Sequence, residues 1–276
     1  MERQKRLIYN SDWTMAMILD ACRYDFFEDI HSEFLDGGLT RVKSEGGYTK
    51  KWFENTFTTP MADVVYINSN PLIPYKIPGW ENRFHRAVDA TEGAWSDEYM
   101  TMLPGRVGRI ARLARAKHPG KRIIVHFMQP HRPYMVLKDT EFNLFGLKRF
   151  KKRMDGEVPG PVDRVRKFVG DLLFRLIGGR RTYLLRKRLG LGGPGYLERI
   201  VEEKNRPYLF SAYAENVKEV LREVRKVVER VPDEDIVVTS DHGELLGEDG
   251  IYEHPVWSDH PVLREVPWLR VEENED

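Results

Sequence analysis

The residues best suited to chemistry lie in one stretch near the C-terminus. Asp241 and His242 follow a β-branched run, Ile236 to Thr239, which predicts a buried parallel strand. Ligands of open α/β sheets bind where such strands end, so both side chains are expected at that edge. A carboxylate beside an imidazole suits a divalent cation such as zinc or manganese, and His254 follows in the next loop. The alternative for an Asp-His-Gly sequence after a strand is an ordinary turn.

Two further predicted strands lead to residues of the same kind. The apolar run from Thr14 to Leu19 ends on Asp20, and the run from Lys121 to Met128 leads to His131. If the sheet is parallel, these ends lie on the same edge as Asp241. Asp20 could equally cap the helix that follows it.

A glycine-rich segment over residues 37–59 offers a nucleophile. It enters a short helix near Trp52, and a helix N-terminus presents unpaired backbone N–H groups to an anion. The hydroxyl of Thr49 is the best-placed nucleophile there, with Ser44 as the alternative. Thr49 could also serve only as a helix cap.

Together these residues predict transfer at phosphorus or sulfur. A cation held by the two strand-end aspartates and His242 would also bind the Thr49 oxygen and favour its ionised, nucleophilic form. His131 and His254 could then bind ester oxygens, assist the leaving group, or complete a second metal site with water. The predicted metal ligands are Asp20, Thr49, Asp241 and His242.

The elements around these residues alternate between strand and helix. Residues 62–67 predict another strand, which ends in a turn over 68–71. A long amphipathic helix over 213–231 leads directly into the C-terminal strand, an order that fits a right-handed parallel crossover. Residues 72–100 are predicted to be loop, and the tail after His254 has no strong pattern.

Residues 141–195 differ in composition from the rest. From Lys148 to Arg188 there are about fourteen Lys or Arg residues against about four acids. Apolar residues recur between them at helical spacing, which predicts an insertion carrying a basic amphipathic helix. Such a helix could lie on an anionic membrane surface, receive a polyanion, or pack as a cap with its charges solvated. There is no specific nucleic-acid motif.

Overall composition sets wide bounds. The 276 residues are 41% hydrophobic, which is enough to form a core. The formal net charge of +1 gives no argument for binding to nucleic acid or to a membrane. The single cysteine, Cys22, cannot form an internal disulfide. The charged N-terminus lacks a signal-peptide pattern, and no apolar run reaches the length of a membrane span. A soluble cytoplasmic protein, at most peripheral at the membrane, is therefore expected.

The motifs resemble the alkaline phosphatase/sulfatase superfamily, and within it the phosphoethanolamine transferases. The stretch from Ser240 to His254 is similar to the one whose Asp-His pair binds zinc in those enzymes, with the later His beside metal and substrate. Residues 128–134 are similar to their Pro-His-x-Pro-Tyr segment, and residues 19–25 to their first metal-binding strand end. By analogy Thr49 takes the nucleophile position. The resemblance covers most of the chain except residues 141–195.

Three departures refine what this resemblance implies. The Cys/Ser-x-Pro-x-Arg motif of formylglycine sulfatases is absent, which favours an unmodified threonine nucleophile. The Asp-x-x-x-His of two-metal phosphodiesterases is also absent, since Phe127 stands four residues before His131. One tight metal site is therefore expected, with room for a weaker second ion. The N-terminal membrane domain of the transferases has no counterpart, so lipid-to-lipid transfer is not expected unless the basic helix docks at a membrane.

The resulting prediction is one alkaline phosphatase-like α/β domain over residues 1–276, a three-layer α/β/α sandwich with a mostly parallel central sheet and a basic helical insertion at about 141–195. It would hydrolyse or transfer phosphate mono- or diesters, with zinc as the first choice of metal and manganese, calcium or magnesium as alternatives. A sulfatase on the same scaffold, or a degenerate protein binding anionic polymers or membranes through residues 148–188, are the competing interpretations. The residues expected to act in catalysis are Thr49, His131 and His254. The residues expected to contact the anionic ester substrate are Arg23, Asn70, His131 and His254.

Overall fold

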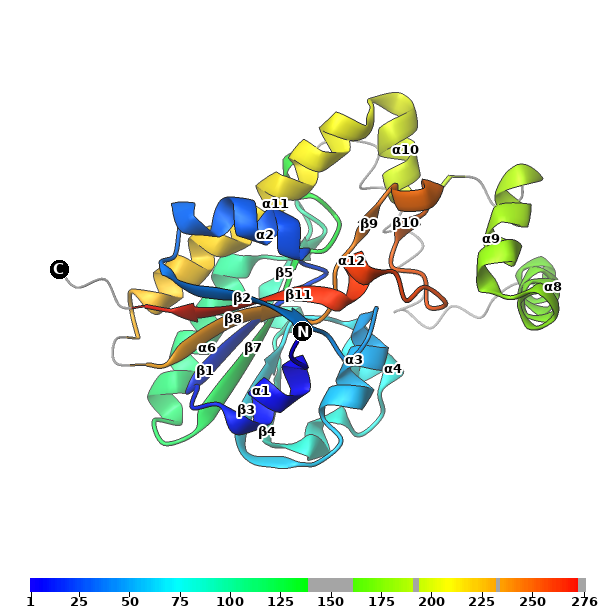
Figure 1. Ribbon diagram of the computed structural model, residues 1–276. Helices are drawn as coiled ribbons and strands as arrows, with labels where there is room; N and C mark the ends of the chain where they lie inside the picture. The colour runs from blue at the N-terminus through cyan, green and yellow to red at the C-terminus, as the bar shows by residue number, and fades with distance from the viewer. Residues whose placement is uncertain (139–160, 191–193, 232–233, 273–276) are drawn as a thin grey trace.

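A seven-stranded sheet forms the centre of this computed structural model, which describes residues 1–138, 161–190, 194–231 and 234–272 (Figure 1). The strand order is β2-β11-β8-β1-β7-β3-β4. Five neighbouring strands, from β8 to β4, run parallel, while β11 is antiparallel to both β8 and β2. The strands are β1 (Met15–Asp20), β2 (Gly37–Lys43), β3 (Met61–Asn68), β4 (Phe84–Asp89), β7 (Arg122–Pro130), β8 (Ile236–Ser240) and β11 (Glu265–Val271). The predicted mostly parallel α/β sheet is confirmed.

Helices cover both faces of this sheet. Figure 1 shows α2 (Tyr24–Ile30) and α11 (Arg206–Val228) on one side, and α1 (Gln4–Asn10), α3 (Thr49–Thr56) and α4 (Leu72–Lys76) on the other. The other helices that the structure describes are α5 (Thr91–Ala94), α6 (Pro104–Lys117), α8 (Pro161–Ile177), α9 (Gly179–Arg188), α10 (Tyr196–Glu203) and α12 (Pro261–Arg264). The short strands are β5 (Trp95–Ser96), β6 (Thr101–Met102), β9 (Leu245–Leu246) and β10 (Tyr252–Glu253). The 3-10 turns are His31–Glu33, Trp80–Arg83, Met135–Leu137 and Glu248–Gly250.

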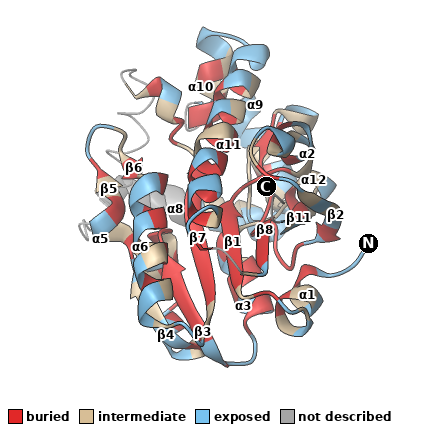
Figure 2. Ribbon diagram, turned by 90° about the vertical axis from the view of Figure 1, so that its left-hand side faces the viewer, coloured by how far each residue is buried: buried red, intermediate tan, exposed pale blue. Residues whose placement is uncertain are grey.

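Strand β1 shows why the centre of the sheet could be recognised from its sequence. All six of its residues are buried, because β7 and β8 flank it and a helical layer covers each face (Figure 2). Alternate side chains point to opposite faces. Met17 and Leu19 join the core beneath α11, while Ala16 and Ile18 join the core beneath α3. The sheet therefore has an apolar core on each of its two faces.

Two segments differ from the sequence prediction. Residues 72–100 are not simply loop, because they contain α4 and the edge strand β4. The tail after His254 contributes β11, which lies inside the sheet between β2 and β8. Most residues of β4 are only partly buried, and β11 is interrupted by Pro267, so neither segment shows a continuous apolar run.

The predicted basic insertion is partly described. Residues 141–160 and 191–193 lie outside the described residues, and between them α8 and α9 form a helical pair. In Figure 1 this pair stands beyond β9, β10 and α12, apart from the central sheet. Whether residues 1–276 make a single domain with an insertion stays a prediction. Among the helices that the structure describes, none combines the length and the apolarity needed to cross a bilayer.

Tyr213 of α11 fastens the turn that follows β1. Its buried hydroxyl donates to the carbonyl of Ala21 at 2.7 Å and accepts from the backbone N–H of Arg23 at 2.9 Å. Replacing Tyr213 with phenylalanine is expected to lower the free energy of unfolding by about 1–3 kcal/mol, because both backbone groups would lose their buried partner. Chemical denaturation measures the change. Tyr134→Phe is the matched control, since the buried Tyr134 hydroxyl has no hydrogen-bond partner among the described residues; equal losses in the two variants would contradict the assignment.

Candidate metal centre

The carboxyl ends of β1 and β8 bring Asp20, Asp241 and His242 together. All three are buried, and one potential ligand atom of each lies within 4.8 Å of the others. The Nε2 atom of His242 is 3.4 Å from Asp241 Oδ2 and 3.8 Å from Asp20 Oδ1. Adjacent parallel pairing of Leu19 with Ser240 sets this arrangement, because both strands end at the same level.

Thr49 joins this group from the first residue of α3. Its Oγ1 lies 3.3 Å from His242 Nε2 and 3.3 Å from Asn70 Nδ2, and the residue is buried. Asn70 also donates to the Asp20 carboxylate, so its amide links the candidate nucleophile, Thr49, to a candidate metal ligand, Asp20. Ser44, the alternative nucleophile, accepts from the N–H of Gly46 and donates to the carbonyl of Asp241. Its hydroxyl is therefore used within the protein.

The donor atoms fit a divalent cation. Asp20 Oδ1 and Asp241 Oδ2 are buried, and neither has a hydrogen-bond partner among the described residues. Burial, followed by the charges of Asp241 and Glu244, raises the pKa of Asp20 well above its ordinary value. A tetrahedral zinc ion with ligands at about 2.0–2.2 Å separates those ligands by about 3.3–3.6 Å. The distances of 3.3, 3.4 and 3.8 Å between the four candidate ligand atoms bracket that spacing.

Contacts with the backbone fix the orientation of the Asp241 and His242 side chains. Asp241 Oδ1 accepts from the N–H groups of Ala21 and His242 at 3.0 and 2.8 Å, which leaves Oδ2 directed at the group. The Nδ1 of His242 lies 2.8 Å from the carbonyl of Gly243, so Nε2 is the nitrogen left for a cation. A Cβ atom at Gly243 would lie 2.0 Å from the carbonyl oxygen of Val262, so only glycine fits after the Asp-His pair.

His126, within strand β7, also lies beside this group. Its Nε2 is 3.8 Å from Asp241 Oδ2, and its Nδ1 is 2.8 Å from the hydroxyl of Tyr66. Burial lowers its pKa to about 4, against an upward pull from Asp241, so the ring is neutral near pH 7. No sequence period indicates which strand residue faces the ligand group, because every residue of β7 after Arg122 is buried.

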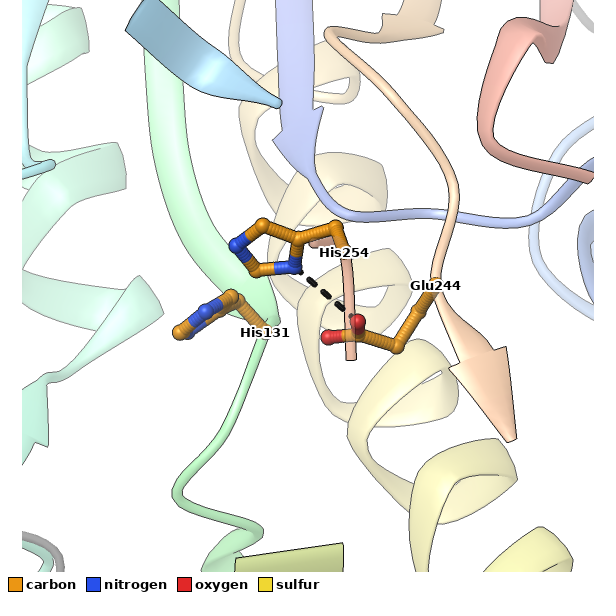
Figure 3. A group of neighbouring side chains, drawn as sticks. All are labelled: His131, Glu244 and His254. Atoms are coloured by element: carbon orange, nitrogen blue, oxygen red, sulfur yellow. Dashed lines mark hydrogen bonds and ion pairs between the residues drawn. The ribbon is translucent and has the colours of Figure 1, made fainter. Parts of the chain in front are cut away.

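A second group consists of His131, Glu244 and His254 (Figure 3). One potential ligand atom from each of its members falls within 4.8 Å of the others. The ring centre of His254 is 4.5 Å from that of His242 and 5.3 Å from that of His131. Glu244 Oε1 lies 3.0 Å from His254 Nδ1. Glu244 was not predicted as a site residue, although its position three residues after Asp241 was the available signal.

The two histidines of this second group have opposite shifts in pKa. Burial, with the nearby His254, lowers the pKa of His131 well below its ordinary value. Burial also lowers the pKa of His254, but the charge and hydrogen bond of Glu244 outweigh it and the net shift is upward. Near neutral pH the group thus pairs a neutral imidazole, able to bind a metal, with an imidazole disposed to hold a proton.

Replacing Glu244 with glutamine is expected to destabilise the metal-free protein at acid pH more than at alkaline pH. His254 has a raised folded pKa, so its ion pair contributes stability that is present below its ordinary pKa of about 6.5 and is lost as pH rises through the raised value. Denaturant unfolding at about pH 6 and about pH 9 tests this. Asp249→Asn, an exposed carboxylate in the same loop, is the control and should show no such pH dependence. A pH-independent loss in Glu244→Gln would contradict the expectation.

Arg23 is held by several contacts within the protein. Its Nη1 donates to Glu248 at 2.8 Å and to the carbonyl of Glu244 at 3.3 Å, while Nε and Nη2 donate to Asp25 at 2.9 and 2.6 Å. These contacts form a local ion pair with Asp25 and indicate that Arg23 positions the loop bearing Glu244. Its contact with substrate, like that of Asn70, stays a prediction.

Comparisons with known proteins match the fold and not the sequence. No family model matches the chain, and no curated protein is significantly similar to it. The soluble domain of lipooligosaccharide phosphoethanolamine transferase A from Neisseria meningitidis superposes with a TM-score of 0.53 at 13% identity, over 93% of this chain and 75% of that one. The periplasmic domain of phosphoethanolamine transferase EptC from Escherichia coli, in complex with Zn, gives 0.50 at 10% identity, over 99% and 75%. The chain spans 48% of the integral membrane form of the Neisseria enzyme, again with a TM-score of 0.50 at 13% identity.

These similarities also correct one expectation. The EptC structures from Escherichia coli and Campylobacter jejuni are periplasmic domains, and the Neisseria protein is an integral membrane protein. The cytoplasmic location predicted from composition is therefore wrong. The chain has the alkaline phosphatase-like α/β fold of the soluble phosphoethanolamine transferase domains.

Proposed function

We propose that the protein is a metal-dependent enzyme that hydrolyses or transfers phosphate esters, with Thr49 as its nucleophile. One observation carries the proposal: the Thr49 hydroxyl lies in the same buried group as Asp20, Asp241 and His242. Two carboxylates and an imidazole could hold a divalent cation, and a cation held beside the Thr49 hydroxyl would activate that hydroxyl as a nucleophile.

Each residue near Thr49 has a distinct part in the proposed reaction. The amide of Asn70 orients the Thr49 oxygen, to which it lies within 3.3 Å. The first turn of α3, where Thr49 sits, directs backbone N–H groups at the oxygens of a transferred phosphoryl group. A bound divalent cation would supply the positive charge that favours an ionised hydroxyl and stabilises the transferred group. Asp20, Asp241 and His242 would hold that cation.

His254 is the proposed proton donor to the leaving group. The charge and hydrogen bond of Glu244 raise the pKa of His254, which favours the protonated ring, and Glu244 holds it through Nδ1, leaving Nε2 for the substrate. The Thr49 hydroxyl gives its proton to water, and as its oxygen forms the bond to phosphorus the ester P–O bond breaks and the leaving oxygen takes the proton of His254. Water or a second alcohol then attacks the phosphothreonine, returns a proton to His254, and breaks the bond between phosphorus and the Thr49 oxygen. His131, with its lowered pKa, suits a neutral contact to an ester oxygen or to a second ion.

The similar structures support this assignment in two respects. Among them are structures named phosphoethanolamine transferases, which supports phosphate esters over sulfate esters as substrates, and one of the similar structures is a complex with Zn. Transfer to an alcohol and hydrolysis by water share the first half of the reaction.

A substrate panel tests the proposal. Protein stripped with chelator and reloaded with zinc, manganese or magnesium is incubated with an aryl phosphate, a bis-aryl phosphodiester and an aryl sulfate. Metal-dependent release from a phosphate ester is expected, and Asp241→Asn corrects for any contaminating phosphatase. Turnover of the sulfate alone would replace the proposal with a sulfuric ester hydrolase. Metal binding without any turnover would favour the degenerate binding protein.

A further inference from the structure

The outward side of α8 and α9 carries exposed apolar side chains. Seven of the thirteen large hydrophobic residues that are exposed in the described part of the chain fall within this one helical pair. Three of them, Val169, Leu172 and Leu176, recur at the spacing of a single helical stripe. The seven are Val169, Leu172, Phe174, Leu176, Leu184, Leu185 and Leu189. An apolar patch of this kind on a protein surface marks an interaction site.

The inner side of the pair is already occupied by the protein. Tyr183 packs on Trp257 with ring centres 5.9 Å apart, and its hydroxyl donates to Glu198 at 3.0 Å. A Cβ at Gly179 would lie 2.2 Å from Trp257, so the start of α9 is seated directly on that ring. This packing covers one side of α9 and leaves its side chains Leu184 and Leu185 exposed.

Basic residues accompany these apolar side chains. Residues 169–190 include six Arg or Lys and a single acid, Asp171. Arg180 pairs with Asp249 and Lys187 with Glu198. Four exposed arginines have no acidic partner among the described residues, and they are Arg175, Arg181, Arg186 and Arg188. Together with the seven apolar residues, these four arginines define the α8–α9 outer surface.

This mixture fits an anionic lipid bilayer better than a nucleic acid. Aliphatic side chains insert between lipid headgroups while arginines pair with lipid phosphates. Single-stranded nucleic acids are bound instead by basic grooves with aromatic stacking platforms, and Phe174 is the one aromatic residue of this surface.

Helix α9, which carries part of the α8–α9 outer surface, also contacts the loop of the second metal-ligand group. Arg180 contacts Asp249, and Lys187 donates to the carbonyl of Gly250 at 3.2 Å. Both partners lie in the loop that runs from Glu244 to His254. We propose that the α8–α9 outer surface docks the protein on an anionic lipid bilayer and so holds this loop beside the lipid surface. The docking does not depend on the proposed catalytic activity.

Vesicle co-sedimentation of the full chain tests the docking. Binding is expected to vesicles with about 30% anionic lipid, weakly to purely zwitterionic ones, and less as salt screens the charges. Each basic residue near such a surface contributes about a five-fold change in binding, so glutamine at all four arginines should lower the partition coefficient at least about 100-fold. Serine at Leu172, Leu176, Leu185 and Leu189 should lower it as well, most clearly at high salt.

A matched variant controls for total charge. Glutamine at four exposed basic residues of β4, α6 and the turn after α11 makes the same change in charge away from the α8–α9 outer surface and should leave vesicle binding nearly unchanged. The four are Arg86, Arg109, Lys117 and Arg230. Unfolding transitions, recorded for each protein, confirm that the variants fold alike.

Three outcomes would overturn the docking. The first is an absence of vesicle binding by the unsubstituted chain, and the second is equal loss in the control and the arginine variant. The third is vesicle binding that the leucine substitutions leave unchanged, alongside tight binding to a soluble sulfated polysaccharide; that result would assign the surface to a polyanion.

Discussion

Replacing Thr49 with alanine is expected to lower kcat for phosphate-ester turnover by at least about 10³-fold, or about 4 kcal/mol of transition-state stabilisation. The variant lacks the oxygen that would form the bond to phosphorus, so only direct attack by water remains. Zinc binding should weaken modestly, because Asp20, Asp241 and His242 still provide three ligand atoms within 4.8 Å. Steady-state kinetics at saturating zinc, with zinc affinity from competition against a chromophoric chelator, separates the two effects.

Two substitutions control for this loss. Thr49→Ser keeps a hydroxyl at the first position of α3 and should retain a measurable share of turnover, since it changes the nucleophile's shape and not its chemistry. Thr56→Ala removes a second buried threonine from the same helix, one whose hydroxyl has no partner among the described residues, and should leave kcat unchanged. If Thr49→Ala kept near-normal turnover, the nucleophile would have to be water or Ser44.

The central strands could be predicted because burial leaves a mark on their sequences. β1 and β8 are buried along their full length, so each reads as an uninterrupted apolar or β-branched run. The end of such a run locates the functional edge of a parallel sheet. Asp20 and Asp241 were found in this way, without reference to any distant residue.

The other strands and site residues have no local sequence pattern that would have identified them. In β2 only Val42 is fully buried, and the strand's pairing with β11 depends on contacts between distant segments. Glu244 and His126 belong to the site through the path of a loop and the side of a strand they occupy. Local spacing encodes neither. Location in the cell was predicted wrongly because one cysteine and a balanced charge are compatible with more than one compartment.

Replacing Asp20 with asparagine is expected to raise the free energy of unfolding of the metal-free protein. With zinc present, the variant is expected to be less stable than the unsubstituted chain. The folded pKa of Asp20 is raised by burial and by the charges of Asp241 and Glu244. A carboxyl with a raised folded pKa costs stability as pH climbs above its ordinary value of about 3.9, and the cost levels off above the folded pKa. Asparagine removes that cost, so the metal-free variant should gain about 1–3 kcal/mol at about pH 8 and almost nothing near pH 4.

Zinc should reverse this order. At a thousand times its dissociation constant, a ligand that binds only the folded state adds about 4 kcal/mol to the free energy of unfolding. The unsubstituted chain should show most of that gain, whereas Asp20→Asn, lacking one anionic ligand, should show little. Denaturant unfolding with chelator and with zinc gives all four values. Asp63→Asn is the control, because the pKa of Asp63 is shifted in the opposite direction. The hydrogen bond from Arg122 lowers that pKa, so the stability that the Asp63 carboxylate contributes is lost only as pH falls. The effect of this substitution on the free energy of unfolding should be the same with and without zinc. Equal stabilisation of Asp20→Asn and the unsubstituted chain by zinc would remove Asp20 from the ligand set, and with it the reason two unpaired carboxylate oxygens are buried at the ends of β1 and β8.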